Sequence, residues 1–380
     1  MVRFFFILLF GLFFSCSGEK TNEQNIFTLT STGHVKSFEL DSDVKYNAFY
    51  LYTFSENNGR EYLSFLNYQT NQILFYDLRT SKFLFKIELA SEGPHGVVRP
   101  SGFYVKDFDN IYISSYAYEG LIKIDTVGHI VQKIPYGKTS EGYKVLPSYT
   151  PSSHPYIAPV FIDGKMFITQ QGVERFHPVD DTPLSVVIDT VSDGIFGTPL
   201  TFDILNDDEQ ESRDLRFSRI YDGTQFVYSF YVDEDVVVTP VDHLGFKTIK
   251  AKSRYISVAT EVQKSGEQGP RSNLEVARYG DIVYDPYREV YYRFAYHYTE
   301  LDSKKNWRGS AVFGRKKFSV IILNKDFEVV GETLFPEAVY NSYVFFVHRD
   351  GLYISRDYQI NYDQSEDYMT FELFSLESNV

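Results

Sequence analysis

One short pattern recurs six times along this 380-residue chain. Each copy pairs a turn containing Asp or Asn with an aromatic strand residue, usually followed by a small hydroxyl residue. Asp-Gly and Asn-Gly supply the positive φ angles that two-residue hairpins need, so each copy predicts a strand–turn–strand unit. The copies run from Asn58 to Ser64, Asp109 to Ser114, Asp163 to Thr169, Asp222 to Ser229, Asp285 to Arg293 and Asp350 to Ser355. They lie about 50 to 65 residues apart, the length of one four-stranded propeller blade.

The rest of each unit repeats as well. A fourth strand follows the third after a short turn, most clearly from Gly128 to Ile134. The third strand often ends in Asp or Asn, as at Asp77, Asp125, Asp189 and Asn324. Four strands joined by short turns in each unit are typical of propeller blades.

The last unit is one strand short, because only Met369 to Leu376 follows its hairpin. The segment from His34 to Leu40 resembles the fourth strand of the second unit, so we expect it to complete the last blade and remove its open edge. The sequence therefore predicts an all-β fold, a six-bladed β-propeller of residues 26–380 closed by an N-terminal strand. Seven blades would result if residues 190–215 held an extra strand pair.

The composition agrees with an all-β fold. The chain has 31 Tyr and 34 Phe residues, and aromatic side chains suit half-buried sheet surfaces. Its formal net charge of −14, without a basic stripe, argues against nucleic acid as a partner.

The N-terminus has the layout of a secretory signal. Arg3 precedes an unbroken apolar run from Phe4 to Phe14, which is too short to span a bilayer, and Ser15 comes before Cys16. We expect a signal peptide at 1–15, lipidation of Cys16 and a polar tether at 16–25. An ordinary cleaved signal or an uncleaved anchor is the alternative. Cys16 is the only cysteine, so the mature chain would have no disulfide and no thiolate site.

The segment Leu12-Phe13-Phe14-Ser15-Cys16 resembles a lipobox, with Phe13 where leucine is usual. Together with the blade pattern, it makes the chain similar to six-bladed, TolB-like propeller lipoproteins of Gram-negative bacteria. Ser17 stands where an aspartate would signal inner-membrane retention, so the resemblance implies an outer membrane lipoprotein, on its periplasmic or cell-surface face. Many proteins of that group have no known activity, so the resemblance carries little about function.

No local motif points to a known chemistry. The sequence has no Gly-x-Ser-x-Gly elbow, His-Glu-x-x-His pair, Walker loop or dinucleotide fingerprint. An acidic loop offers oxygen ligands for calcium, but its spacing does not match an EF-hand, and we interpret it as a solvated surface. Its residues are Asp203, Asp207, Asp208, Glu209, Glu211 and Asp214. We expect no metal site and no cofactor.

Propellers usually bind ligands at the mouth of the central channel, where long loops join neighbouring blades. The loops assigned to that face are rich in arginine and aromatic side chains, a composition that suits recognition of proteins or of sugars. The predicted ligand-binding residues are His95, Arg99, Tyr116, Arg175, His177, Arg278 and Trp307. The first hypothesis is a lipid-anchored monomer that binds a protein or saccharide there. The alternatives are an extracytoplasmic hydrolase or lyase acting on a glycan, and a structural part of an envelope complex.

Overall fold

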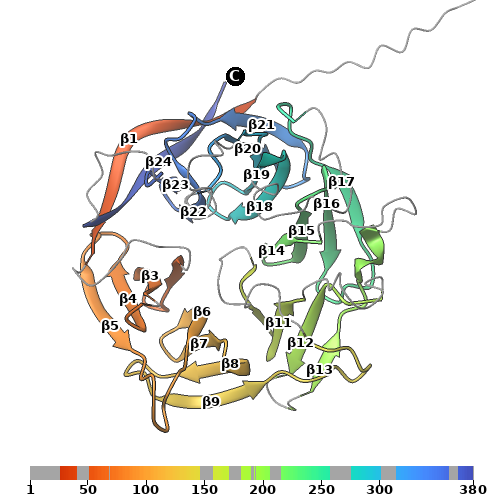
Figure 1. Cartoon of the computed structure of the whole chain (residues 1–380). Coiled ribbons are helices and arrows are strands. Elements are labelled where there is room, and N and C mark those ends of the chain that lie inside the picture. Colours follow the sequence, from red (N-terminus) through yellow and green to blue (C-terminus); the bar gives the residue numbers. More distant parts are fainter. Residues whose placement is uncertain are drawn as a thin grey trace, which may run out of the picture.

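The described part of the chain forms a ring of six four-stranded antiparallel sheets around a central axis (Figure 1). The computed structural model describes residues 26–40, 51–67, 69–145, 157–170, 181–189, 192, 194–205, 215–256, 275–300, 314–358 and 367–379. The prediction of a six-bladed β-propeller is confirmed. The seven-blade alternative is wrong, because the described part of 190–215 holds only the outer strand of blade three and one turn of 3-10 helix.

Strands follow one another from the inside of each blade to the outside. Blade one contains β2 (Leu51–Ser55), β3 (Glu61–Asn67), β4 (Gln72–Asp77) and β5 (Phe83–Glu88); blade two contains β6 (Pro100–Asp107), β7 (Asn110–Ser115), β8 (Tyr118–Ile124) and β9 (Ile130–Pro135); blade three contains β10 (Val160–Ile162), β11 (Lys165–Thr169), β12 (Ser185–Asp189) and β13 (Ile195–Gly197), followed by the helix η3 (Phe202–Leu205). Blade four contains β14 (Phe217–Tyr221), β15 (Gln225–Phe230), β16 (Asp235–Pro240) and β17 (Lys247–Lys250); blade five contains β18 (Arg278–Asp285), β19 (Val290–Tyr296), β20 (Phe318–Leu323) and β21 (Val329–Leu334); blade six contains β22 (Asn341–His348), β23 (Gly351–Ser355), β24 (Tyr368–Ser378) and, outermost, β1 (Phe27–Glu39).

The recurrent Asp and Asn residues build the turns between strands. The Asp125 carboxylate accepts backbone N–H groups of Val127 and His129 at 3.0 and 2.8 Å, so the side chain closes the turn into β9. Asn324 does the same before β21, accepting from Asp326 and Glu328 at 2.9 Å each. Short polar side chains favour such turns because they bond their own backbone a few residues on.

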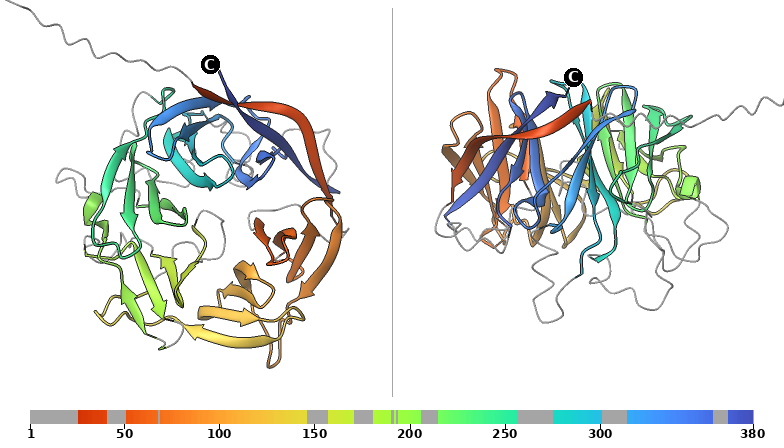
Figure 2. Two further views of the ribbon diagram at one scale, coloured as in Figure 1. Left: turned by 180° about the vertical axis from the view of Figure 1, so that it is seen from behind. Right: turned by 90° about the horizontal axis from the view of Figure 1, so that it is seen from above.

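The N-terminal strand closes the ring, as predicted. Its second half, around Phe38, pairs with the start of β24, and its first half pairs with the end of β24. The register shifts between Ser31 and Val35, where Gly33 takes a φ of 71°. Figure 2 shows β1 lying along β24 at the outside of the ring. This pairing joins the two ends of the chain in a single blade.

Aromatic packing between neighbouring blades forms the core. Phe294 of blade five stacks on Phe345 of blade six with ring centroids 4.2 Å apart, and Phe54 of blade one packs edge to face on Phe108 of blade two at 5.4 Å. Such pairs add stability beyond the apolar area they bury. Within the described residues, no helix is long and apolar enough to cross a membrane.

The strands of each blade end at two opposite faces of the ring, and the site is described by these faces. We call the front face the end where the first strand of a blade begins and the second strand turns into the third. The back face is the other end, where the first strand turns into the second. Figure 1 shows the six inner strands facing the axis, so residues from several blades meet at either end of them.

Candidate functional site

Three arginines gather at the front-face ends of blades four and five. We call Arg216, Arg278 and Arg315 the arginine cluster. Arg216 directly precedes β14, Arg278 is the first residue of β18, and Arg315 precedes β20. Arg278 and Arg315 are buried, at 5% and 2% exposure. Buried guanidinium groups stay charged, so this end of the channel carries concentrated positive charge.

Tyrosine rings connect the cluster. Arg216 and Arg278 both lie over the ring of Tyr231, at 5.7 and 5.6 Å from its centroid. Arg315 lies 5.8 Å from the centroid of Tyr296, whose ring packs edge-on against Tyr343 at 5.6 Å. These contacts run from the end of β15 through β19 to β22, so blades four, five and six share one surface. Cation–π contact holds the guanidinium planes in place.

One buried carboxylate lies among these groups. Asp281 of β18 accepts hydrogen bonds from the hydroxyls of Tyr231 at 2.7 Å and Tyr296 at 3.2 Å. Burial raises its pKa to about 6, although these bonds and the nearby Arg278 act in the opposite direction. Below that pH, Asp281 is neutral, and the arginine cluster has no opposing charge from it.

Backbone carbonyls fix the position of Arg315. Its Nη2 donates to the carbonyls of Val276 and, at 3.2 Å, His297. The pKa of Arg315 is lowered to about 10, mainly by burial and in part by the charges of Arg278 and Arg216. The three cations are linked through the rings of Tyr231 and Tyr296. An anion placed among them would be attracted by all three.

The arrangement suits an acidic ligand with ring faces. Guanidinium groups bind carboxylates with two parallel hydrogen bonds, and tyrosine rings offer flat faces on which a sugar ring can stack. Gly280 permits the close packing beside them, because a Cβ there would lie 2.3 Å from the Tyr296 ring. The cluster therefore has the components for holding a charged saccharide.

Of the residues predicted from sequence, Arg278 belongs to this cluster. Arg99 and Tyr116 contact each other, with the guanidinium 5.5 Å from the ring centroid, at the front-face edge of blade two. Blade two lies across the ring from blade five, so this pair faces the cluster over the channel (Figure 1). Arg175, His177 and Trp307 lie outside the described residues, as does Cys16.

His95 lies apart from the others. Its ring is 4.5 Å from that of His129, and its Nδ1 accepts the backbone N–H of Ile130 at 3.1 Å. Both partners are at the start of β9, the outer strand of blade two. We therefore leave His95 out of the proposed site.

Several residues of this site, in the arginine cluster and around it, were missing from the sequence-based prediction. Arg216, Arg315, Tyr231, Tyr296 and Asp281 come from separate loops and strands with no common motif. The sequence did hold a signal for the two other arginines. Arg216 and Arg315 each come shortly before a strand that begins at the front face, as Arg278 does. Asp281 carried none, since it lies inside an ordinary strand.

Two histidines belong to the scaffold, the buried His243 and the half-buried His297. His243 bonds the Tyr228 hydroxyl at 2.8 Å, and that hydroxyl contacts Ser185 of blade three at 2.9 Å. His297 contacts Ser319 at 2.9 Å. Burial lowers the pKa of each histidine to about 4, so both are neutral at pH 7. They link strands and blades through hydrogen bonds.

Metal ligands do not cluster in the described part of the chain, where no group of three His, Cys, Asp or Glu side chains could hold an ion. Of the predicted acidic loop, Asp203 lies in η3, and the other five residues lie outside the described ranges.

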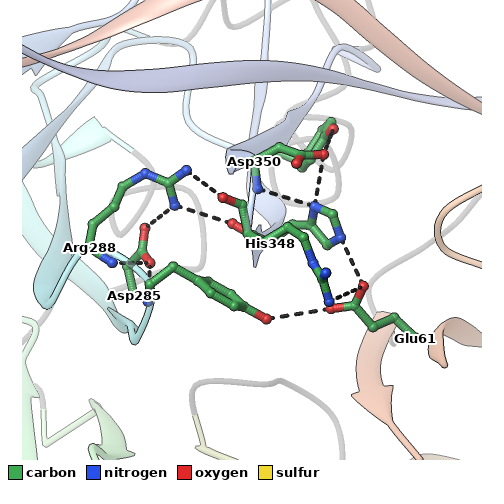
Figure 3. A network of polar contacts seen from close by, with 8 residues as sticks. Glu61, Asp285, Arg288, His348 and Asp350 are labelled. Atoms are coloured by element: carbon green, nitrogen blue, oxygen red, sulfur yellow. Dashed lines mark hydrogen bonds and ion pairs between the residues drawn. The ribbon is translucent and has the colours of Figure 1, made fainter. Parts of the chain in front are cut away.

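A second polar site lies at the back face. Glu61 of blade one, Asp285 and Arg288 of blade five, and His348 and Asp350 of blade six form one network of hydrogen bonds and ion pairs (Figure 3). It borders a cavity of about 250 Å³ between the inner strands β2, β18 and β22.

Comparison with known proteins identifies relatives of this chain. A family model described as a domain of unknown function, DUF4221, matches residues 27–334. A crystal structure of a DUF4221 member from Bacteroides vulgatus is similar over 94% of this chain and all of that one, with a TM-score of 0.81 and 27% identity. A candidate exported protein of Bacteroides fragilis aligns over 94% of this chain and 98% of its own, with a TM-score of 0.56 and 11% identity, and so shares the fold. No curated protein matches. Because the family model covers most of the chain, the protein belongs to the DUF4221 family.

Proposed function

We propose that this protein binds an acidic saccharide at the front-face mouth of its channel, through the arginine cluster. The observation that supports this most is that, among the described residues, Tyr231 and Tyr296 connect three arginines with one buried carboxylate, Asp281, at one end of the inner strands. Fixed cations in a partly buried site attract an anion more strongly than exposed ones do, because water screens them less. Arg99 and Tyr116 would offer an extended saccharide a second contact across the channel.

The same proposal places the protein in the cell envelope, anchored by lipid on Cys16. The signal-like N-terminus supports this placement, and an exported protein of related fold agrees with it. Several acyl chains would each contribute about 0.8 kcal/mol per buried methylene, which makes anchoring lasting. If lipid labelling survives in a Cys16→Ala variant, the proposed anchor is wrong. That result would not affect the proposal for the saccharide site.

Binding should depend on the charge of Arg278. We expect Arg278→Gln to weaken binding of a galacturonic acid oligomer by about 2 kcal/mol, the scale of a hot-spot residue. Isothermal titration should show little binding of the neutral galactose oligomer to either protein. Arg349→Gln is a matched control, because this exposed arginine lies at the back face. Equal loss in both variants would mean that net charge alone governs binding and would refute the site.

The affinity should also rise as the pH falls through about 6. Protonation of Asp281, to which Tyr231 and Tyr296 donate, removes its negative charge from the neighbourhood of Arg216, Arg278 and Arg315. His297, with a pKa of about 4, does not change charge between pH 5 and 7.5. We expect about tenfold tighter binding at pH 5 than at pH 7.5. Asp281→Asn should bind equally tightly at both, and a titration series that finds the same pH dependence in this variant would exclude Asp281 as its origin.

A further inference from the structure

The back-face cavity combines apolar walls with one polar corner. Phe54 of β2 and Phe346 of β22 line it together with Tyr284 and Tyr287 of blade five, and Glu61 and His348 form the polar corner. Its volume of about 250 Å³ is a little below the roughly 300–1,000 Å³ of pockets for drug-sized ligands, so it suits a small molecule.

Glu61 is the acceptor in that corner. Its Oε2 is 3.1 Å from His348 Nε2 and 3.3 Å from Arg349 Nη2. Its Oε1 accepts only a long contact of 3.4 Å among these neighbours, from the Tyr287 hydroxyl. Because 3.4 Å is near the outer limit of a hydrogen bond, Oε1 can accept a shorter one from a ligand.

The rest of the network holds this corner in place. Arg288 bonds Asp285 at 3.0 Å and donates to the backbone carbonyls of His348 and Arg349 at 3.3 and 2.8 Å. The His348 Nδ1 lies 3.3 Å from the Asp350 backbone nitrogen and 3.1 Å from the Asp350 carboxylate, and its Nε2 lies 3.1 Å from Glu61 Oε2. Figure 3 shows Glu61 and His348 side by side, with Arg288 bracing the strand end. The polar corner is thus built before any ligand arrives.

The charge of the network favours a cation. In formal charges, Glu61, Asp285 and Asp350 contribute three negative charges, and Arg288 and Arg349 contribute two positive ones. The back face therefore has the opposite sign from the arginine cluster. A carboxylate beside aromatic rings is the combination that recognises organic ammonium groups.

We propose that this cavity is a second ligand site, which binds a small aromatic or aliphatic amine. The ammonium group would donate to Glu61 Oε1 and lie against the Tyr287 ring, and the apolar body would fill the space beside Phe54 and Phe346. The proposal is independent of the acidic ligand at the front face.

Ligand-observed NMR with 2-phenylethylamine tests the site, with phenylacetate as the probe of opposite charge and 2-phenylethanol as the neutral one. The amine should bind at least about tenfold more tightly than either, the range expected for a hydrogen bond to a charged group. Glu61→Gln should lose about tenfold in amine affinity. Glu88→Gln, an exposed carboxylate with a side chain 73% accessible, should bind as the parent does.

A second variant guards against misfolding of the first. Tyr287 is 51% exposed, so Tyr287→Leu should fold normally and lose about threefold in affinity for the amine. Unchanged amine binding in both Glu61→Gln and Tyr287→Leu, equal binding of phenylacetate, or no saturable binding would overturn the proposal. Arg278→Gln should leave amine binding unchanged, so failure here and failure of saccharide binding are separate results.

Discussion

Deleting residues 26–40 should abolish cooperative unfolding or cause aggregation. This deletion removes β1, whose Phe38 is fully buried and packs edge to face on Tyr76 of blade one at 5.6 Å. At its other end, the Ile26 N–H donates to the Val330 carbonyl of blade five at 2.9 Å. The strand therefore ties blade six to both neighbours, and its loss would also expose the edge of β24 for pairing with other chains.

A control deletion of residues 17–25, within the predicted tether at 16–25, should unfold at the same denaturant concentration as the parent. Urea unfolding followed by circular dichroism, with light scattering for aggregation, distinguishes the two. A protein lacking 26–40 that unfolds as sharply and at the same midpoint as the parent would contradict this account of ring closure.

Arg293→Met should lower the free energy of unfolding by about 3–5 kcal/mol. Arg293 of β19 is fully buried, with its guanidinium 4.0 Å from the Tyr279 ring centroid. It donates to the Ser229 hydroxyl and to five backbone carbonyls of blade four, those of Phe230, Asp233, Glu234, Asp235 and Ala251. Methionine fills similar space but leaves these acceptors without a donor, which is costly in an interior.

Burial lowers the pKa of Arg293 to about 10, so it stays charged at pH 7 and its contribution persists there. The same substitution at the exposed Arg79 should change the free energy of unfolding by less than about 0.5 kcal/mol. If urea unfolding gives equal midpoints for Arg293→Met and Arg79→Met, this arginine does not hold blades four and five together.

The fold was predictable because its signals are local. An Asp or Asn that caps a turn, such as Asp125 before β9, acts on residues two to four positions away. Such positions recur once per blade and can be counted in the sequence. Ring closure was also predictable. The His34–Leu40 segment resembles an outer strand, and the last blade lacked an outer strand beyond β24.

The candidate site was predictable only in part, because it depends on contacts between blades. Arg216 and Arg315 are about a hundred positions apart in the chain, yet Arg216 lies over Tyr231 and Arg315 over Tyr296, the two tyrosines that donate to Asp281. His95 shows the opposite case, since its loop runs toward the outer strand of blade two before it reaches the inner one. Assigning a loop to the front or back face tells at which end of a blade a residue lies. It does not tell how far that residue is from the axis of the channel.

The back-face network was missed for a related reason. His348 lies within a strand and belongs to no local motif, but it meets Glu61 of another blade almost 290 positions away. The strand ends that meet near the axis come from different blades. Which of their residues contact one another depends on how the blades are arranged, and the sequence of one blade does not contain that information.

A crystal structure of the protein with a bound galacturonic acid trimer would test the central proposal most directly. The account predicts a sugar carboxylate within about 3 Å of a guanidinium nitrogen of Arg278, Arg315 or Arg216, with a sugar ring against Tyr231 or Tyr343. A trimer bound elsewhere on the protein, or no bound trimer at a saturating concentration, would contradict it.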